Sequence, residues 1–201
     1  MASEKLKTEI RREQIAEAAL GVIAMHGIKG LNVARIARRI GLVPSALYRH
    51  FRGKDEVLDA VLAMIEQRLL ENVDVARREQ PSAPERLQLL LRLHIKFIRE
   101  NQGVLRVIFS EDLFGGKPAR KARVYGMIRR YLHKIEEIVR EGQAQNVFRS
   151  ELNPETVSIM FLGLIQPAAI LWNMSDGEFD VTRHSEKAWN IFSEMIVRTG
   201  R

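Results

Sequence analysis

Apolar side chains recur along this chain with the period of an α-helix, and this period constrains the fold more than any other feature. Near the N-terminus, one buried helix face is formed by Ile15, Ala18, Ala19, Val22 and Ile23. No stretch alternates apolar and polar residues as a half-buried strand does. We therefore expect an all-α fold of about nine helices.

Glycines divide the first quarter of the chain into short helices. Gly27 ends the first helix, Asn32 is a good N-cap for a second helix, and Gly41 ends that second helix. A third helix is expected from Pro44 to His50, with Leu47 and Phe51 directed inward and Ser45, Ala46, Tyr48 and Arg49 outward. Two short helices joined by a glycine turn are typical of a helix-turn-helix, whose second helix enters the major groove of DNA. An ordinary three-helix core has the same pattern.

The remaining helices are delimited by caps and turns. Ser82 and Glu85 form a capping-box pattern, Asn153 precedes Pro154 at another helix start, and Thr182 is the expected cap of the last helix. The expected helices after the first three span about 54–78, 82–101, 103–114, 118–145, 153–174 and 182–199. Pro167 should kink its helix, because proline removes one backbone hydrogen bond.

Positive charge is confined to the N-terminal quarter. Residues 1–54 hold eleven Lys or Arg against four Asp or Glu, which accounts for the whole net charge of +7. No acidic residue lies between Ala18 and Lys54. Such an excess attracts a polyanion, most simply the phosphates of nucleic acid. The alternative is a basic surface that is merely solvated.

Sequence motifs for catalysis and metal binding are lacking. There is no phosphate loop, dinucleotide-binding glycine motif or nucleophile elbow. The His133 to Glu136 spacing reverses the Glu-x-x-His order of di-iron bundles and occurs once. The chain has no cysteine and only five scattered histidines. We expect no enzyme activity, no metal and no cofactor.

The sequence also predicts a cytoplasmic protein that does not enter a membrane. The first dozen residues are charged and lead into no apolar signal-peptide core. The longest apolar run, from Ile159 to Trp172, is shorter than a membrane span and contains Gln166 and Pro167.

The first fifty or so residues resemble the N-terminal signature of the TetR family of transcriptional regulators. The matching positions are Gln14–Ala19, Gly27, Val33–Ala37, Gly41, Pro44–Phe51 and Lys54. The resemblance implies a three-helix helix-turn-helix DNA-binding domain in residues 1–54 and a connecting helix at about 54–78. It implies a helical-bundle domain for effector binding and dimerisation in residues 79–201.

The resemblance also implies roles for individual residues. The implied DNA-binding residues are Asn32, Pro44, Ser45, Ala46, Tyr48, Arg49, His50 and Lys54. Asn32, Tyr48, His50 and Lys54 match positions that contact phosphates, which position the domain without reading sequence. Base reading falls to Ser45, Ala46 and Arg49, with Arg49 the candidate for a guanine edge. The chain departs from the signature at Val43, where serine is usual, and at Leu31, where threonine is frequent.

The second half has more apolar surface than a simple core requires. The resemblance to the TetR family implies a small-molecule pocket in this half. Its candidate lining residues are His94, Phe97, Phe109, Phe114, Tyr125, Gln166 and Trp172, which can equally fill the core. A dimer interface is expected at Phe161, Leu164, Ile165, Ala168, Ile191, Phe192 and Met195, because a helix that is apolar on two sides must be covered twice.

The predicted function is that of a homodimeric, sequence-specific transcriptional repressor. Its expected partners are double-stranded operator DNA, a second copy of itself and an unidentified small apolar or amphipathic effector. Two other hypotheses remain open. One is a nucleoid or division factor that binds DNA with the same domain and needs no effector. The other is a helical-bundle ligand carrier or enzyme.

Overall fold

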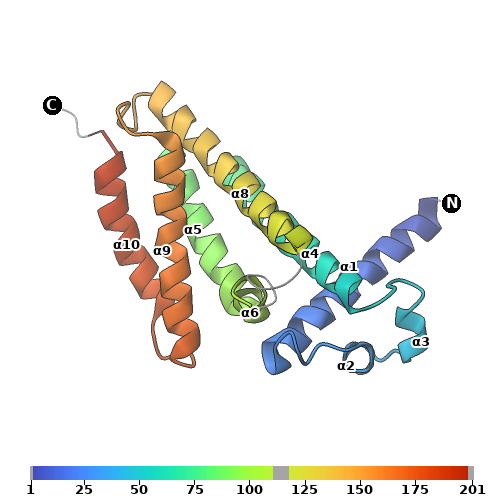
Figure 1. Ribbon diagram of the computed structural model, residues 1–201. Coiled ribbons are helices and arrows are strands. Elements are labelled where there is room, and N and C mark those ends of the chain that lie inside the picture. Colours follow the sequence, from blue (N-terminus) through green and yellow to red (C-terminus); the bar gives the residue numbers. More distant parts are fainter. Residues whose placement is uncertain (1, 111–117, 199–201) are drawn as a thin grey trace. The chain divides into compact units, whose positions relative to one another are not determined.

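The computed structural model describes residues 2–110 and 118–198, with side chains from residue 8 onward. Within those residues the chain is helical, and its only β-type pairing is an isolated bridge between Phe148 and Val197. The helices (Figure 1) are α1 (Ala2–His26), α2 (Val33–Arg39), α3 (Pro44–Leu47), α4 (Lys54–Glu79), α5 (Ala83–Glu100), α6 (Gly103–Ile108), α8 (Pro118–Ala144), α9 (Pro154–Met174) and α10 (Val181–Ile196). The all-α prediction is confirmed.

Side-chain caps begin several helices where the sequence predicted them. The Asn32 side-chain oxygen accepts a hydrogen bond from the Arg35 backbone N–H at 2.9 Å. The Ser82 hydroxyl accepts from the Glu85 backbone N–H at 3.4 Å, and the Glu85 carboxylate accepts from the Ser82 backbone N–H at 3.3 Å, which are the two bonds of the predicted capping box. The cap of α10 is Asp180 and not Thr182 as predicted. The helix begins one residue earlier than expected, at Val181, so the Asp180 carboxylate accepts from the Arg183 N–H at 3.0 Å.

The chain divides into two compact units. Unit 1 consists of Met1–Gln67 and Asn101–Val124, and unit 2 of Arg68–Glu100 and Tyr125–Arg201. Helices α4 and α8 therefore each contribute residues to both units. The domain boundaries inferred from the sequence stay a prediction, and the structure adds that α6 groups with the N-terminal helices.

In unit 1, α6 packs tightly against α1 (Figure 1). Gly103 opens α6 and is buried. A Cβ atom at Gly103 would lie 2.4 Å from the Leu20 carbonyl oxygen of α1, so glycine is required for this approach. In the described residues α6 ends at Ile108, earlier than the predicted end at 114, and Phe109 is its C-cap.

In unit 2, α9 packs against α10 and α5. The rings of Phe161 and Phe192 meet edge to face with centroids 6.1 Å apart. Arg77 on α4 binds Glu137 and Glu141 on α8 at 3.2 and 2.8 Å. Pro167 lies inside α9 without ending it.

Helix α9 covers the predicted range almost residue for residue, and as a whole it is apolar over a longer stretch than the run from Ile159 to Trp172. Its 21 residues reach the length and composition of a membrane-crossing helix, and it is the only such helix in the described part of the chain. The buried side of α9, which includes Phe161, Ile165 and Ala169, packs within unit 2. A helix that is apolar on two sides can have the same length and composition in a protein outside the membrane.

Candidate nucleic-acid interface

The turn between α2 and α3 has the geometry expected of a helix-turn-helix. Gly41 adopts a φ of 66°, in the left-handed region that favours glycine. The Leu42 N–H returns to the Ala37 carbonyl oxygen at 2.9 Å, which closes the end of α2. Val43 then precedes Pro44 at the start of α3 and makes no side-chain capping bond. A serine, which is usual at this position, could cap the helix, whereas valine cannot.

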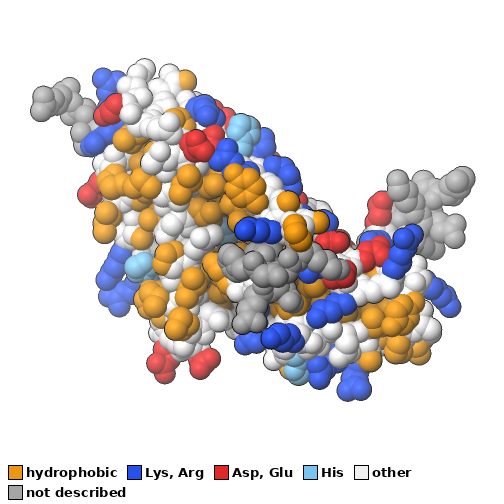
Figure 2. Space-filling model, viewed as in Figure 1, with side chains coloured by type: hydrophobic (Ala, Val, Ile, Leu, Met, Phe, Trp, Pro, Cys, Tyr) orange, Lys and Arg blue, Asp and Glu red, His pale blue; other side chains and the backbone are white. Residues whose placement is uncertain are grey.

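Helix α3 has one buried and one exposed face, as the sequence predicted. Leu47 and Phe51 are only 1% and 3% exposed. The exposed residues include Pro44, Ser45, Tyr48 and Arg49, while Ala46 is half-buried. Hydrophobic side chains gather over α3 in the view of Figure 2, with Lys and Arg side chains around them.

The helix itself is shorter than predicted, because it ends at Leu47 and not at His50. The backbone N–H groups of His50 and Phe51 both donate to the Leu47 carbonyl oxygen at 2.9 Å. These two bonds close the chain into a turn, which carries Phe51 back into the core. The outward-facing residues therefore occupy little more than one helical turn.

The residues predicted to contact phosphates differ in how freely they can do so. Tyr48 is 59% exposed. The carboxamide oxygen of Asn32 accepts the capping bond, and its amide nitrogen donates one N–H to the Gly30 carbonyl oxygen at 3.5 Å, which leaves its second N–H for a phosphate. His50 is half-buried, and its Nδ1 is buried without a hydrogen-bond partner among the described residues. Lys54, also half-buried, is the first residue of α4. The roles of these four residues as phosphate contacts stay a prediction.

Arg12 ties α1 to the turn after α3, a role that the sequence analysis missed. Its guanidinium donates to the His50 carbonyl oxygen, lies 4.2 Å from the Phe51 ring centroid and binds the Glu56 carboxylate at 3.2 Å. Glu56 also accepts from the Arg52 backbone N–H at 2.8 Å. That backbone bond, followed by Arg12, lowers the pKa of the Glu56 carboxyl. The available signal was a cation at position 12, on the same helix face as Ile15 and Ala19.

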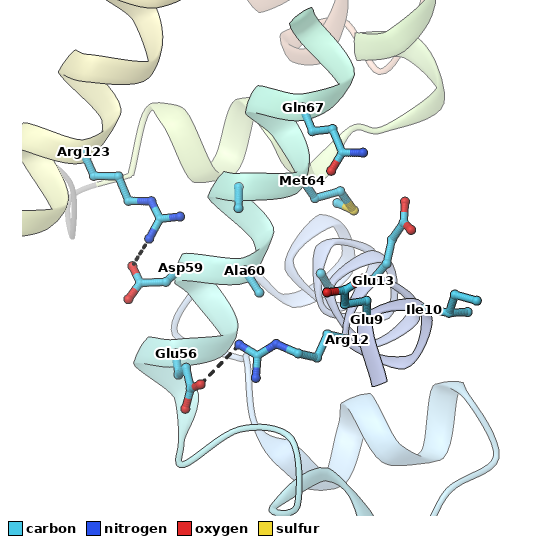
Figure 3. A pocket seen from close by; sticks show the side chains of 12 residues that line it. Glu9, Ile10, Arg12, Glu13, Glu56, Asp59, Ala60, Met64, Gln67 and Arg123 are labelled. Carbon is cyan, nitrogen blue, oxygen red and sulfur yellow. Dashed lines mark hydrogen bonds and ion pairs between the residues drawn. The ribbon is translucent and has the colours of Figure 1, made fainter. Parts of the chain in front are cut away.

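The first turns of α4 are held by further ion pairs in unit 1. Asp55 binds Arg120 of α8 at 2.7 Å, and Asp59 binds Arg123 of α8 at 3.6 Å. Figure 3 shows Arg12 directed at Glu56 and Arg123 directed at Asp59 beside a groove of about 620 Å³ between α1 and α4. Residues near the start of α4 are therefore fixed from both α1 and α8.

The residues predicted to line a ligand pocket fall into three groups. His94 is buried, whereas Phe97, Gln166 and Trp172 are half-buried. Phe109 and Tyr125 are 42% and 65% exposed. Phe114 lies outside the described residues. Within the described ranges, no cluster of three or more His, Cys, Asp or Glu side chains is placed to hold a metal ion.

His94 has a buried polar partner that the sequence pattern did not reveal. His94 Nδ1 lies 2.9 Å from the Tyr131 hydroxyl, and the two rings meet edge to face. Burial lowers the pKa of His94 to about 4 and raises the pKa of Tyr131. Both groups are therefore uncharged at neutral pH. Tyr131 occupies the same inward helix face as Ile135 and Ile138, so its sequence position resembles that of any core residue.

The residues predicted to form a dimer interface separate into core and surface positions. Phe161, Ile165, Ala168 and Phe192 are at most 2% exposed, so they pack within unit 2 and cannot touch a second copy in this arrangement. Leu164 is half-buried. Ile191 and Met195 are 67% and 40% exposed. Other exposed apolar side chains on α9 are Ile159, Met160, Ile170, Leu171 and Met174.

Comparison with known proteins supports both halves of the architecture. Residues 15–61 match the family of bacterial regulatory proteins of the tetR family. Residues 80–196 match the tetracyclin repressor-like C-terminal domain. The nucleoid occlusion factor SlmA of Shewanella pealeana is 23% identical over 189 residues, which cover 94% of this chain and 96% of that protein.

Solved structures share the fold. The fatty acid degradation regulator FadR from Bacillus halodurans has a TM-score of 0.78 and 22% identity, covering 90% of this chain and 94% of that one. The regulator FadR from Bacillus subtilis, solved in complex with stearoyl-CoA, has a TM-score of 0.76 and 20% identity, covering 91% of this chain and 98% of that one. With matches to both the N-terminal and the C-terminal family models, the chain belongs to the TetR family and is a DNA-binding regulator.

Proposed function

We propose that this protein is a cytoplasmic, homodimeric repressor that binds operator DNA through α3 and is released by a small apolar or amphipathic ligand. The observation that carries the proposal is the exposed face of α3. Ser45 and Arg49 face outward over a core made by Leu47 and Phe51. This short helix lies in the part of the chain that holds the whole positive charge excess. Phosphate attraction and base reading therefore come from the same region.

Dimerisation is supported by an apolar surface that unit 2 leaves uncovered. On α10, Ala188, Ile191 and Met195 lie on one side, away from the buried Trp189 and Phe192. On α9, Met160, Leu171 and Met174 are exposed on the side opposite Phe161 and Ile165. A second copy related by a two-fold axis would cover this surface, because such an interface uses the same patch on both chains. The interface proposed here thus keeps Leu164, Ile191 and Met195 and replaces the four core residues with these exposed side chains.

The effector is proposed to bind in unit 2 near His94 and Tyr131. This buried pair is a polar element among apolar neighbours on α5 and α8, such as Leu91, Ile95 and Ile135. One or two hydrogen-bonding groups in an apolar interior are what an amphipathic ligand needs for orientation. The regulator FadR from Bacillus subtilis was solved with stearoyl-CoA, which makes acyl compounds the first class to test.

Release from DNA would follow from a change in the spacing of the two recognition helices. Dimeric DNA-binding proteins bind half-sites separated by the helical repeat of DNA. A change in the distance between the two recognition helices therefore weakens binding. The ligand must bind one arrangement more tightly than the other, and a coupling of about 1–3 kcal/mol is typical.

A thermal-shift screen tests the effector. Fatty acids and acyl-CoAs of graded chain length are added, and a ligand that binds the native state raises the melting temperature. Each hit is then added to a protein–operator complex in a fluorescence anisotropy assay. We expect a hit to release DNA from the wild type and to act more weakly on Tyr131→Phe. A ligand that stabilises the protein yet leaves operator affinity unchanged would contradict the regulatory role.

The second candidate is a nucleoid factor that needs no effector, which is favoured by the similarity to SlmA over nearly the whole chain. Chromatin immunoprecipitation separates the two functions. A repressor occupies a few sites next to promoters, whereas a nucleoid occlusion factor is expected at many sites dispersed over the chromosome. Dispersed sites, together with no response to any ligand in the screen, would favour the second candidate.

A further inference from the structure

The tip of the recognition helix is unusually apolar for a surface that meets DNA. Val43, directly before α3, is 63% exposed, and Tyr48 is 59% exposed. Pro44 lies between them in sequence and is also exposed. Figure 2 shows hydrophobic side chains gathered over the region of α3. Single exposed apolar residues are ordinary on a protein surface, but several adjoining ones mark a binding site.

Among the described residues, Val43 is not part of the core that supports α3. Its side chain makes no capping bond to α3. The inward packing of this helix is supplied by Leu47 and Phe51, which are almost fully buried. A solvent-exposed valine at a helix N-cap is also disfavoured relative to serine or threonine. Val43 therefore costs helix stability without contributing to the core. This cost suits a side chain that contacts a partner outside the chain.

The major groove offers one apolar group to such a side chain. The base edges there consist of hydrogen-bond donors and acceptors, apart from the 5-methyl group of thymine. A valine placed against a donor or acceptor would exclude water without replacing its hydrogen bond, which is costly. Against a thymine methyl group it buries apolar surface on both sides. The N-terminal residues of a recognition helix are those that reach base edges.

We propose that Val43 is a specificity-determining residue that reads the 5-methyl group of a thymine in each half-site, with Pro44 beside it. The inference rests on the DNA-binding function and adds a base identity to it. Ser45 on α3 and Arg49 in the turn after it supply the hydrogen bonds to base edges, and Val43 directly before α3 supplies the apolar contact. The operator half-site therefore contains a thymine that is selected through its methyl group.

The test uses DNA from which single methyl groups have been removed. A binding site is first selected by the full-length wild type from a randomised duplex pool. Each thymine of the selected site is then replaced by deoxyuridine, which lacks only the 5-methyl group. At one thymine per half-site we expect affinity to fall about fourfold, the effect of one buried methyl group. Tyr48, which is assigned to phosphate, should not change this preference when mutated to Phe.

Protein variants assign the effect to Val43. Val43→Ala should bind thymine and deoxyuridine sites equally at that position, and Val43→Ile should keep the preference. Met25→Ala is the matched control, since Met25 is 65% exposed at the end of α1 and outside the recognition helix. Because Val43 is exposed, all variants should melt at the wild-type temperature.

The outcomes separate the two claims. Equal affinity of the wild type for every deoxyuridine-substituted site would overturn the methyl contact while leaving the DNA-binding function intact. A thymine preference that survives in Val43→Ala would also overturn the role of Val43. Failure to enrich any sequence from the pool would instead overturn the proposed function, and the methyl contact with it.

Discussion

The helix-turn-helix region and unit 2 use their side chains in contrasting ways. In the helix-turn-helix region a few consecutive residues alternate between the core and the surface, as Leu47 at the end of α3 and Arg49 in the turn after it do. Each position there has one evident role. In unit 2 many residues are apolar, and the same residue type is buried in the core at Ile165 and exposed at Ile191. A short region with strict geometry is therefore easier to interpret than a large apolar bundle.

The largest expected effect tests the exposed surface of unit 2. Ile191→Glu places a charge on each side of the proposed two-fold interface, so the protein should become monomeric in light scattering at micromolar concentration. Loss of the second half-site contact should then weaken operator binding by about 100-fold or more. The matched control is Asn190→Glu, which adds the same charge at an exposed position on another side of α10. A dimeric Ile191→Glu protein would contradict the interface.

The next prediction tests the interior of unit 2 through pH. Because burial lowers the pKa of His94 from 6.5 to about 4, the unfolded state binds a proton in this range that the folded state does not. Stability is thus full above pH 6.5 and falls as the pH is lowered from 6.5 to 4. The loss from this group is about 3 kcal/mol. Urea unfolding at several pH values measures it, and His94→Leu should remove that part of the pH dependence. An unchanged pH profile in His94→Leu would mean that another group is responsible.

The smallest effect concerns the contact that positions α3. Arg12→Ala removes the bonds to the His50 carbonyl and to Glu56. Since Arg12 is partly exposed, we expect a loss of about 1 kcal/mol, or about fivefold in operator affinity. Arg11→Ala, its exposed neighbour on α1, controls for the loss of one positive charge. Arg12→Lys should restore the pairing with Glu56 more fully than the bond to His50. Equal losses in Arg11→Ala and Arg12→Ala would show that only charge matters.

The sequence predicted the helices and the faces of α3 because local rules determine them. Gly41 and the Asn32 cap have short-range consequences that can be inferred from neighbouring residues. Arg12 and Tyr131 were missed because their hydrogen-bond partners lie 37 or more positions away in the sequence. Asp180 was missed because two capping residues, Asp180 and Thr182, lie close together in the sequence.

The residues predicted for the dimer interface show the same dependence on long-range packing. Periodicity identified α9 and α10 as too apolar for one buried stripe. It could not assign Phe161 to the core and Ile191 to the surface, because that assignment depends on which helix packs on which face. Long-range packing is therefore the part of the candidate sites that the sequence left open.

Selection from a randomised duplex pool, with wild type and two variants, tests the central claim most directly. The wild type should enrich a two-fold symmetric site. Arg49→Ala should lose preference at one position of each half-site, by about 1–3 kcal/mol. Lys54→Ala should keep the sequence preference, bind all sites more weakly and show a flatter salt dependence. If the wild type enriches no site, or if Arg49→Ala retains the full preference, α3 does not read DNA as described here.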